Sequence, residues 1–130
     1  MRKNYVLIIY LLLLFVSCNK SSVKNMDKLE IMKQGSQLFA KYGCAVCHSL
    51  EGKKIYGPPL NGIYMKEITV LRKGKEYKVI ADRKYLKKSI MQPRYEKVLE
   101  FKNTEMPIAT FPEEDADILV EYIIAIGDKN

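Results

Sequence analysis

Residues 44–48 read Cys-Ala-Val-Cys-His, and this motif limits what the chain can fold into more than any other feature. The spacing C-x-x-C-H is that of a c-type haem attachment site. Two thiols three positions apart can each form a thioether bond to one edge of a porphyrin. The histidine that follows can then bind the iron as an axial ligand. The motif therefore predicts one covalently held haem c, attached through Cys44 and Cys47, with His48 on the iron.

Two other kinds of site use closely spaced cysteines, and the residue counts weigh against both. The chain has three cysteines and one histidine, whereas a structural zinc site takes four Cys or His ligands at paired spacings. A carboxylate ligand would complete a zinc site only in an unusual form. A thioredoxin-like redox pair is expected beside a βαβ unit, but the segments that flank this motif look helical. Haem is favoured, and the zinc and redox sites stay open as alternatives.

The first 17 residues have the pattern of a targeting segment. Arg2 and Lys3 precede an unbroken apolar run of 12 residues, 5–16, which is shorter than the roughly 20 residues that a membrane-spanning helix needs. The run ends at Ser17-Cys18 and then turns polar, which resembles the lipobox of bacterial lipoproteins, although Phe15 stands where leucine is usual. We expect a signal peptide over 1–17 and a lipid on Cys18. An ordinary secretory signal or an uncleaved anchor is the alternative.

These segments predict an exported protein, anchored by its lipid on the periplasmic side of a membrane. Cleavage before Cys18 would leave 113 residues, which is the size of one small domain. The polar residues 18–25 then form an acylated tether, and residues 26–130 form the domain.

A helical pattern runs from Met26 to Tyr42, with Asp27 at its acidic start, where negative charge suits the helix dipole. Gly35 lies within the apolar face of this helix. A glycine there costs about 1 kcal/mol relative to alanine, and the pattern alone allows either the close approach of another helix or a tolerated glycine.

The middle of the chain changes character. Residues 68–80 predict a β-hairpin with a glycine turn. Asp82 can cap a helix that runs to about Met91, and a second short helix is expected over 96–101. Pro112 and the acidic residues after it begin a closing helix, whose broad apolar face ends at Gly127.

Taken together, these residues resemble a class I cytochrome c over about 26–127. The resemblance implies an all-α fold in which the first and last helices cross at Gly35, with a small β-hairpin insertion near 66–80. It also implies that Tyr56, Pro58 and Leu60, in the loop after the motif, contact the haem, and that the Pro58 carbonyl accepts a hydrogen bond from the His48 ring. The hairpin and the helix after it resemble the cytochrome c domain fused to subunit two of some bacterial haem–copper oxidases, here free-standing.

The second axial ligand of the iron must come from a residue other than histidine, because His48 is the only one. The resemblance points to Met106, which precedes Pro107 and stands in the loop before the closing helix. His/Met is an established ligand pair of cytochromes c. Met91 is the second candidate.

The charge distribution suggests what the protein meets. Residues 18–104 carry 19 basic and 8 acidic side chains, while 105–130 carry 1 and 7. A basic face near an exposed haem edge, with Lys53 and Lys54 as candidates, would steer the protein to a redox partner with an acidic docking patch. Anionic lipid headgroups would attract the same charges. Nucleic acid is not expected, because no recognition motif accompanies the charge.

Three functions follow from this reading. The first is a membrane-tethered carrier of single electrons between respiratory partners, which is not an enzyme. The second is a cytochrome subunit bound tightly in an oxidase or reductase complex. The third is a small haem enzyme or sensor whose sixth ligand can be displaced.

Overall fold

The computed structural model describes residues 23–127, which contain three α-helices and one small antiparallel sheet. The helices are α2 (Lys28–Lys41), α3 (Arg83–Met91) and α4 (Glu113–Gly127). The strands β1 (Glu67–Arg72), β2 (Lys75–Ile80) and β3 (Lys97–Val98) lie in the order β2-β1-β3. Three 3-10 helices complete the structure: η1 (Val23–Asn25), η2 (Cys44–Val46) and η3 (Leu99–Phe101).

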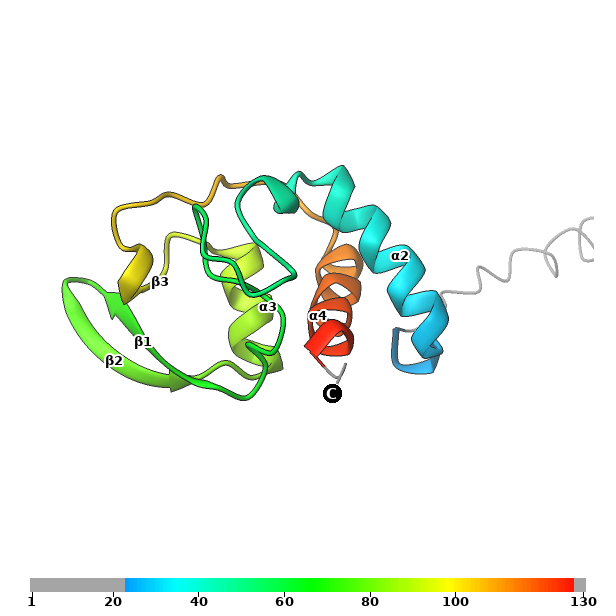
Figure 1. Ribbon diagram of the computed structural model, residues 1–130, viewed down its shortest axis with the longest axis horizontal. Coiled ribbons are helices and arrows are strands. Elements are labelled where there is room, and N and C mark those ends of the chain that lie inside the picture. The colour runs from blue at the N-terminus through cyan, green and yellow to red at the C-terminus, as the bar shows by residue number, and fades with distance from the viewer. Residues whose placement is uncertain (1–22, 128–130) are drawn as a thin grey trace, which may run out of the picture.

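Helix α4 forms the centre of the core, between α2 on one side and α3 on the other (Figure 1). Three acidic residues occupy its first turn, where they complement the positive end of the helix dipole. Nine of its residues are buried: Ala116, Ile118, Leu119, Val120, Tyr122, Ile123, Ile124, Ala125 and Ile126. The closing helix expected from the sequence is confirmed, and its apolar face packs against the other helices.

Helices α2 and α4 cross where α2 carries Gly35. A Cβ atom added at Gly35 would lie 2.3 Å from Cβ of Tyr122, far inside the contact distance of two carbon atoms. Phe39, one turn further along α2, packs against the Tyr122 ring with the ring centroids 5.8 Å apart. The glycine therefore permits a close helix approach, and the expected crossing of the first and last helices is confirmed.

The hairpin predicted near 66–80 is confirmed as β1 and β2, joined at Lys73 and Gly74. The expectation of an all-α fold is wrong, because the hairpin extends into a three-stranded sheet. β3 pairs with β1 through Val70 and Val98, and Val70 is fully buried. The domain is thus a mixture of helices and strands.

The segment 96–101, expected as a short helix, instead contains β3 followed by η3. Backbone pairing with β1, which lies more than 20 residues earlier in the chain, replaces local helical hydrogen bonds at Lys97 and Val98. The preceding helix is as expected: α3 ends at Met91, and the Asp82 carboxylate caps it by accepting a hydrogen bond from the Tyr85 amide at 2.7 Å.

The start of the described chain lies within the segment expected to be a tether. Val23–Asn25 forms η1, which contacts α4, so ordered structure begins before Met26. Cys18 and the predicted signal peptide lie outside the described residues. Within 23–127, none of the helices has the length and apolar character needed to cross a bilayer.

Candidate haem site

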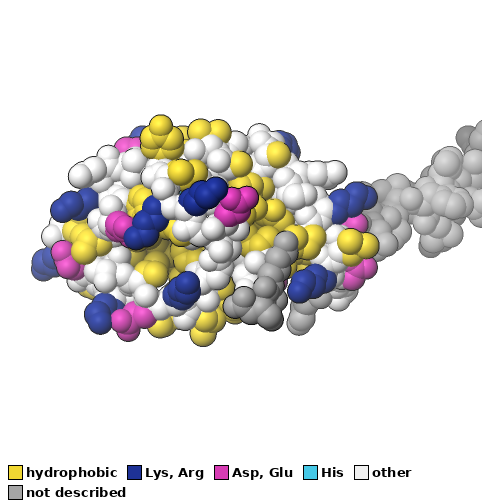
Figure 2. Space-filling view, in the orientation of Figure 1, with side chains coloured by type: hydrophobic (Ala, Val, Ile, Leu, Met, Phe, Trp, Pro, Cys, Tyr) yellow, Lys and Arg dark blue, Asp and Glu magenta, His cyan; other side chains and the backbone are white. Residues whose placement is uncertain are grey.

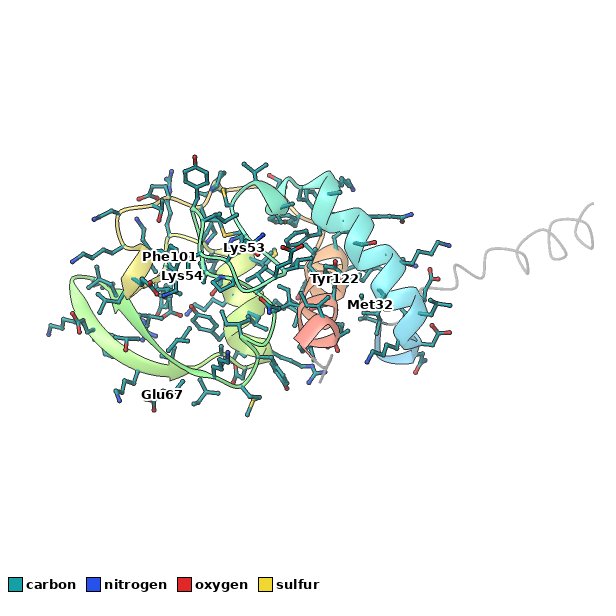
Figure 3. All side chains as sticks on the ribbon, in the orientation of Figure 1. Met32, Lys53, Lys54, Glu67, Phe101 and Tyr122 are labelled. Carbon is teal, nitrogen blue, oxygen red and sulfur yellow. The ribbon has the colours of Figure 1, made fainter. Side chains whose placement is uncertain are left out.

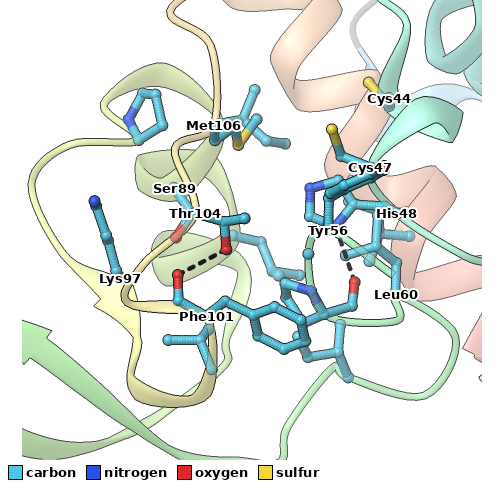
Figure 4. Close-up of a pocket in the computed structure, with 18 of the residues that line it drawn as sticks. Cys44, Cys47, His48, Tyr56, Leu60, Ser89, Lys97, Phe101, Thr104 and Met106 are labelled. Carbon is cyan, nitrogen blue, oxygen red and sulfur yellow. Dashed lines mark hydrogen bonds between the residues drawn. The ribbon is translucent and has the colours of Figure 1, made fainter. Parts of the chain in front are cut away.

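The Cys-x-x-Cys-His motif forms a tight turn directly after α2. Cys44–Val46 is the 3-10 helix η2, and the Cys44 carbonyl accepts hydrogen bonds from the amides of Cys47 at 3.1 Å and His48 at 2.9 Å. The turn brings both cysteine side chains to the same edge of one cavity (Figure 4). Both are half-buried free thiols, available for thioether bonds.

The loop after the motif holds the His48 ring in one orientation. Nδ1 of His48 lies 2.9 Å from the Pro58 carbonyl oxygen. Since a carbonyl can only accept, Nδ1 carries the proton and the lone pair of Nε2 is free for a metal. Burial lowers the pKa of His48, against the opposing effect of the Pro58 carbonyl, and this favours the neutral ring that metal binding needs.

Gly57 brings this loop against the ring. A Cβ atom at Gly57 would lie 2.7 Å from Cε1 of His48 and 3.2 Å from the Cys47 carbonyl oxygen. Two backbone hydrogen bonds fasten the loop to the motif, from the Gly57 amide to Cys47 at 2.8 Å and from the Leu60 amide to Ser49 at 2.9 Å. The backbone of Gly57 and the carbonyl oxygen of Pro58 therefore both contact the His48 ring and limit its movement.

Met106 faces the same cavity from the segment that joins η3 to α4. Figure 4 shows it across the open space from His48 and next to Thr104. The Thr104 hydroxyl donates to the Phe101 carbonyl at 2.9 Å, and the Thr104 amide donates to the same oxygen at 3.0 Å. This small turn positions the chain just before Met106, which is half-buried.

Of the methionines in residues 23–127, Met106 alone lines the cavity. Met91, the second candidate, packs against the hydrophobic core, and so does Met32. Met65 is 59% exposed. Of the two candidate methionines, Met106 therefore lies at the cavity, where its sulfur could bind a metal, and Met91 does not.

The cavity is apolar and open at one edge. The empty space inside it, counted out to its open mouth, is about 1080 Å³. Apolar side chains from all three helices and the loops form its walls: Phe39, Leu60, Ile63, Leu86, Ile90, Phe111, Leu119 and Ile123. Tyr56, Pro58 and Leu60 all line the cavity; Tyr56 is 65% exposed, whereas Leu60 is buried.

Neither alternative use of the cysteines finds support. Within residues 23–127 there is no group of three or more His, Cys, Asp or Glu side chains placed to hold a metal ion, which a structural zinc site would need. Burial raises the pKa of Cys44, whereas the reactive cysteine of a redox pair has a lowered pKa. In the described part of the chain the motif follows a helix and is separated from the antiparallel sheet, so no βαβ unit surrounds it there.

Several cavity residues were missed from the sequence. Ser89 on α3 and Thr104 are half-buried polar residues at the wall, and Phe101 lies below them (Figure 4). The helical spacing of Tyr85, Leu86, Ser89 and Ile90 was a usable signal for that wall. Glu96 and Lys97 also line the cavity, but they reach it through the pairing of β3 with β1, for which no local pattern exists.

The donor set fits a haem c. The cavity offers two thiols at one edge, an imidazole with a free Nε2, and a thioether across the apolar space. These are the groups that attach and axially bind haem in cytochromes c.

Comparison with known proteins agrees with this geometry. A family model described as cytochrome c matches residues 32–126, which is most of the chain and includes the motif, the sheet and α4. A search of curated proteins gives no match. Members of this family carry covalently attached haem c and transfer electrons. The chain therefore belongs to the cytochrome c family, as a class I monohaem cytochrome c.

Proposed function

We propose that this protein is a membrane-tethered carrier that moves single electrons between respiratory redox partners. The proposal rests on one observation: His48 and Met106 face each other across a single apolar cavity. Bound there, a haem supplies a one-electron redox centre. With one protein ligand on each face, no coordination position remains for a substrate, and this favours a carrier over an enzyme.

Each side chain of the site would have a separate role in binding the haem. Cys44 and Cys47 would hold the porphyrin edge through thioether bonds, and His48 would bind the iron through Nε2 while Pro58 orients its ring. Met106 would supply a second ligand, and a thioether ligand raises the reduction potential relative to a second nitrogen ligand. The apolar walls keep water from most of the macrocycle.

Carbon monoxide tests whether both axial positions are occupied. We expect the reduced wild-type protein to resist carbon monoxide at neutral pH, because Met106 blocks the only position that the gas could take. The measurement is the absorption spectrum of the reduced protein before and after the gas is added. Rapid and complete binding would instead identify a haem enzyme or sensor with a displaceable ligand.

The partner would dock at the open edge of the cavity. Three exposed apolar side chains lie on the cavity wall or close in sequence to residues that line it. Tyr56 lines the cavity, Val46 stands between the two cysteines in the sequence, and Ile108 follows two residues after Met106. Figure 2 shows hydrophobic and charged side chains mixed across one face of the domain. Contact at the open edge of the cavity would bring a second redox centre close to the haem edge.

Lysines beside this edge would steer an acidic partner. Figure 3 labels Lys53 and Lys54 on the loop that follows the motif, where Lys53 pairs with Glu51 at 3.1 Å and Lys54 with Glu100 at 2.6 Å. Exposed pairs of this kind are worth about 0–1 kcal/mol, so both lysines can exchange partners. The rate of electron exchange with an acidic redox protein should then fall as salt is added.

The tether would begin at Cys18. Four residues separate it from Val23, where η1 begins, and the extended chain between Cys18 and Val23 spans at most about 18 Å. The domain would therefore stay near the membrane surface. We expect the wild type to need detergent for extraction from membranes and Cys18→Ala to be released without it.

Size-exclusion chromatography of the same extract separates carrier from subunit. Elution of the detergent-solubilised wild type as a small protein supports the carrier. Elution within a large oxidase or reductase complex would support the second function, a bound subunit. Wild-type protein released without detergent would contradict the lipid on Cys18.

A further inference from the structure

The cavity wall contains a buried carboxylate that the proposed function does not use. Glu96 is the only charged residue buried among residues 23–127, and its side chain is 5% exposed. It lines the cavity immediately before β3. Oε2 of Glu96 accepts two hydrogen bonds from Arg72, at 2.6 Å from Nη2 and 3.0 Å from Nε.

Arg72 stands behind this carboxylate, on the side away from the cavity. It is the last residue of β1, it is not among the cavity residues, and its side chain is 30% exposed. Its guanidinium lies over the rings of Tyr77 at 4.8 Å and Tyr95 at 5.1 Å. Hydrogen bonding to Glu96 raises the pKa of Arg72 further. The pair is therefore ordered, with its negative end toward the cavity and its positive end toward the solvent.

We propose that Glu96 and Arg72 shift the reduction potential of the haem in this cavity in opposite directions, so that Arg72 offsets most of the lowering caused by the Glu96 carboxylate. Reduction adds one negative charge to the site. A buried carboxylate in the wall opposes that change, and the guanidinium behind it offsets most of the opposition, because the two charges lie close together. The pair holds the potential between the values that either charge alone would impose. This inference rests on the haem site of the proposed function.

Removing the carboxylate charge should raise the potential. In Glu96→Gln the side chain keeps its shape and can still accept a hydrogen bond from Arg72, but the positive charge is no longer offset. A unit charge that acts over about 10 Å at an effective dielectric constant near 20 changes an equilibrium constant roughly tenfold, and we expect a change of this order in the equilibrium constant for reduction. For one electron this is a rise of about 59 mV, measured by spectroelectrochemical titration.

Two further variants identify the charges as the cause. The double variant Arg72→Gln with Glu96→Gln removes both charges, so its potential should return close to the wild-type value. Glu100→Gln is the matched control: Glu100 also pairs with a cation at 2.6 Å, but its side chain is 56% exposed and it does not line the cavity. Solvent screens that charge, and we expect a shift several times smaller.

An unchanged or lowered potential in Glu96→Gln would overturn the proposal. So would a double variant whose potential stays as high as that of Glu96→Gln. If Glu96→Gln does not accumulate, the double variant compared with Arg72→Gln alone isolates the same carboxylate, and its removal should again raise the potential. Haem content, measured as the pyridine haemochrome, distinguishes a failure of this inference from a failure of the proposed function. Wild-type protein without haem would refute the proposed function itself.

Discussion

In Met106→Ala the haem iron is expected to lose its second protein ligand, which leaves one coordination position open. The alanine side chain cannot reach the iron, so the reduced variant should bind carbon monoxide rapidly while the wild type does not. The absorption band that marks methionine sulfur on ferric iron should disappear. The reduction potential should fall substantially, within the ~0.8 V range over which axial ligands set it, because a thioether favours the reduced state. Absorption spectra and a potentiometric titration measure all three.

Met91→Ala is the matched control for this prediction. Met91 is half-buried against the core and does not line the cavity, so its truncation should cost about 0.5–3 kcal/mol of stability and leave the spectrum unchanged. If Met106→Ala keeps the sulfur band and Met91→Ala loses it, the assignment of the second ligand is wrong.

Local patterns in the sequence were enough to predict most of the regular elements of the domain. Asp82 caps α3 as expected from its position before an amphipathic segment, and the hairpin follows its alternation and its glycine turn. Cys44, Cys47 and His48 were also predictable, because their spacing is local and haem attachment requires those residue types together. The loop residues Tyr56, Pro58 and Leu60 were predicted only from the family resemblance.

What the sequence did not reveal depends on contacts between distant segments. β3 is two residues long, and it exists because Val98 and Lys97 find partners in β1. That pairing also brings Glu96 under the guanidinium of Arg72, at the end of the same strand. A short segment with no clear period gives no sign of such a partner, and the segment 96–101 was therefore interpreted as a helix.

Gly35 shows how the structure can resolve a question that a pattern leaves open. Periodicity placed it on the apolar face of α2 but could not distinguish a tolerated glycine from a required one. The 2.3 Å approach of an added Cβ to Tyr122 shows that the position must stay small. Figure 3 shows Tyr122 on α4 where this helix meets α2.

Gly35→Ala should therefore destabilise the protein although alanine is the better helix former. Helix propensity favours the change by about 1 kcal/mol. The added methyl group overlaps Cβ and Cγ of Tyr122, and Cβ stays fixed to the α4 backbone in every rotamer. The two helices would have to move apart, so we expect a cost at the upper end of the usual range for overpacking, about 3 kcal/mol. We expect a net loss of about 2 kcal/mol in the free energy of unfolding, measured by urea titration of the haem-loaded protein.

Gln37→Ala and a double variant test the mechanism of that loss. Gln37 is exposed on the same helix, so its replacement should change stability by no more than about 0.5 kcal/mol. Tyr122→Gly removes the whole side chain that the new methyl group would meet, including the Cβ atom at 2.3 Å. Combined with Gly35→Ala it should cost clearly less than the sum of the two single changes, because contacting residues are not additive. Additive costs, or a Gly35→Ala variant as stable as the wild type, would mean that the two helices do not depend on the glycine for their close approach.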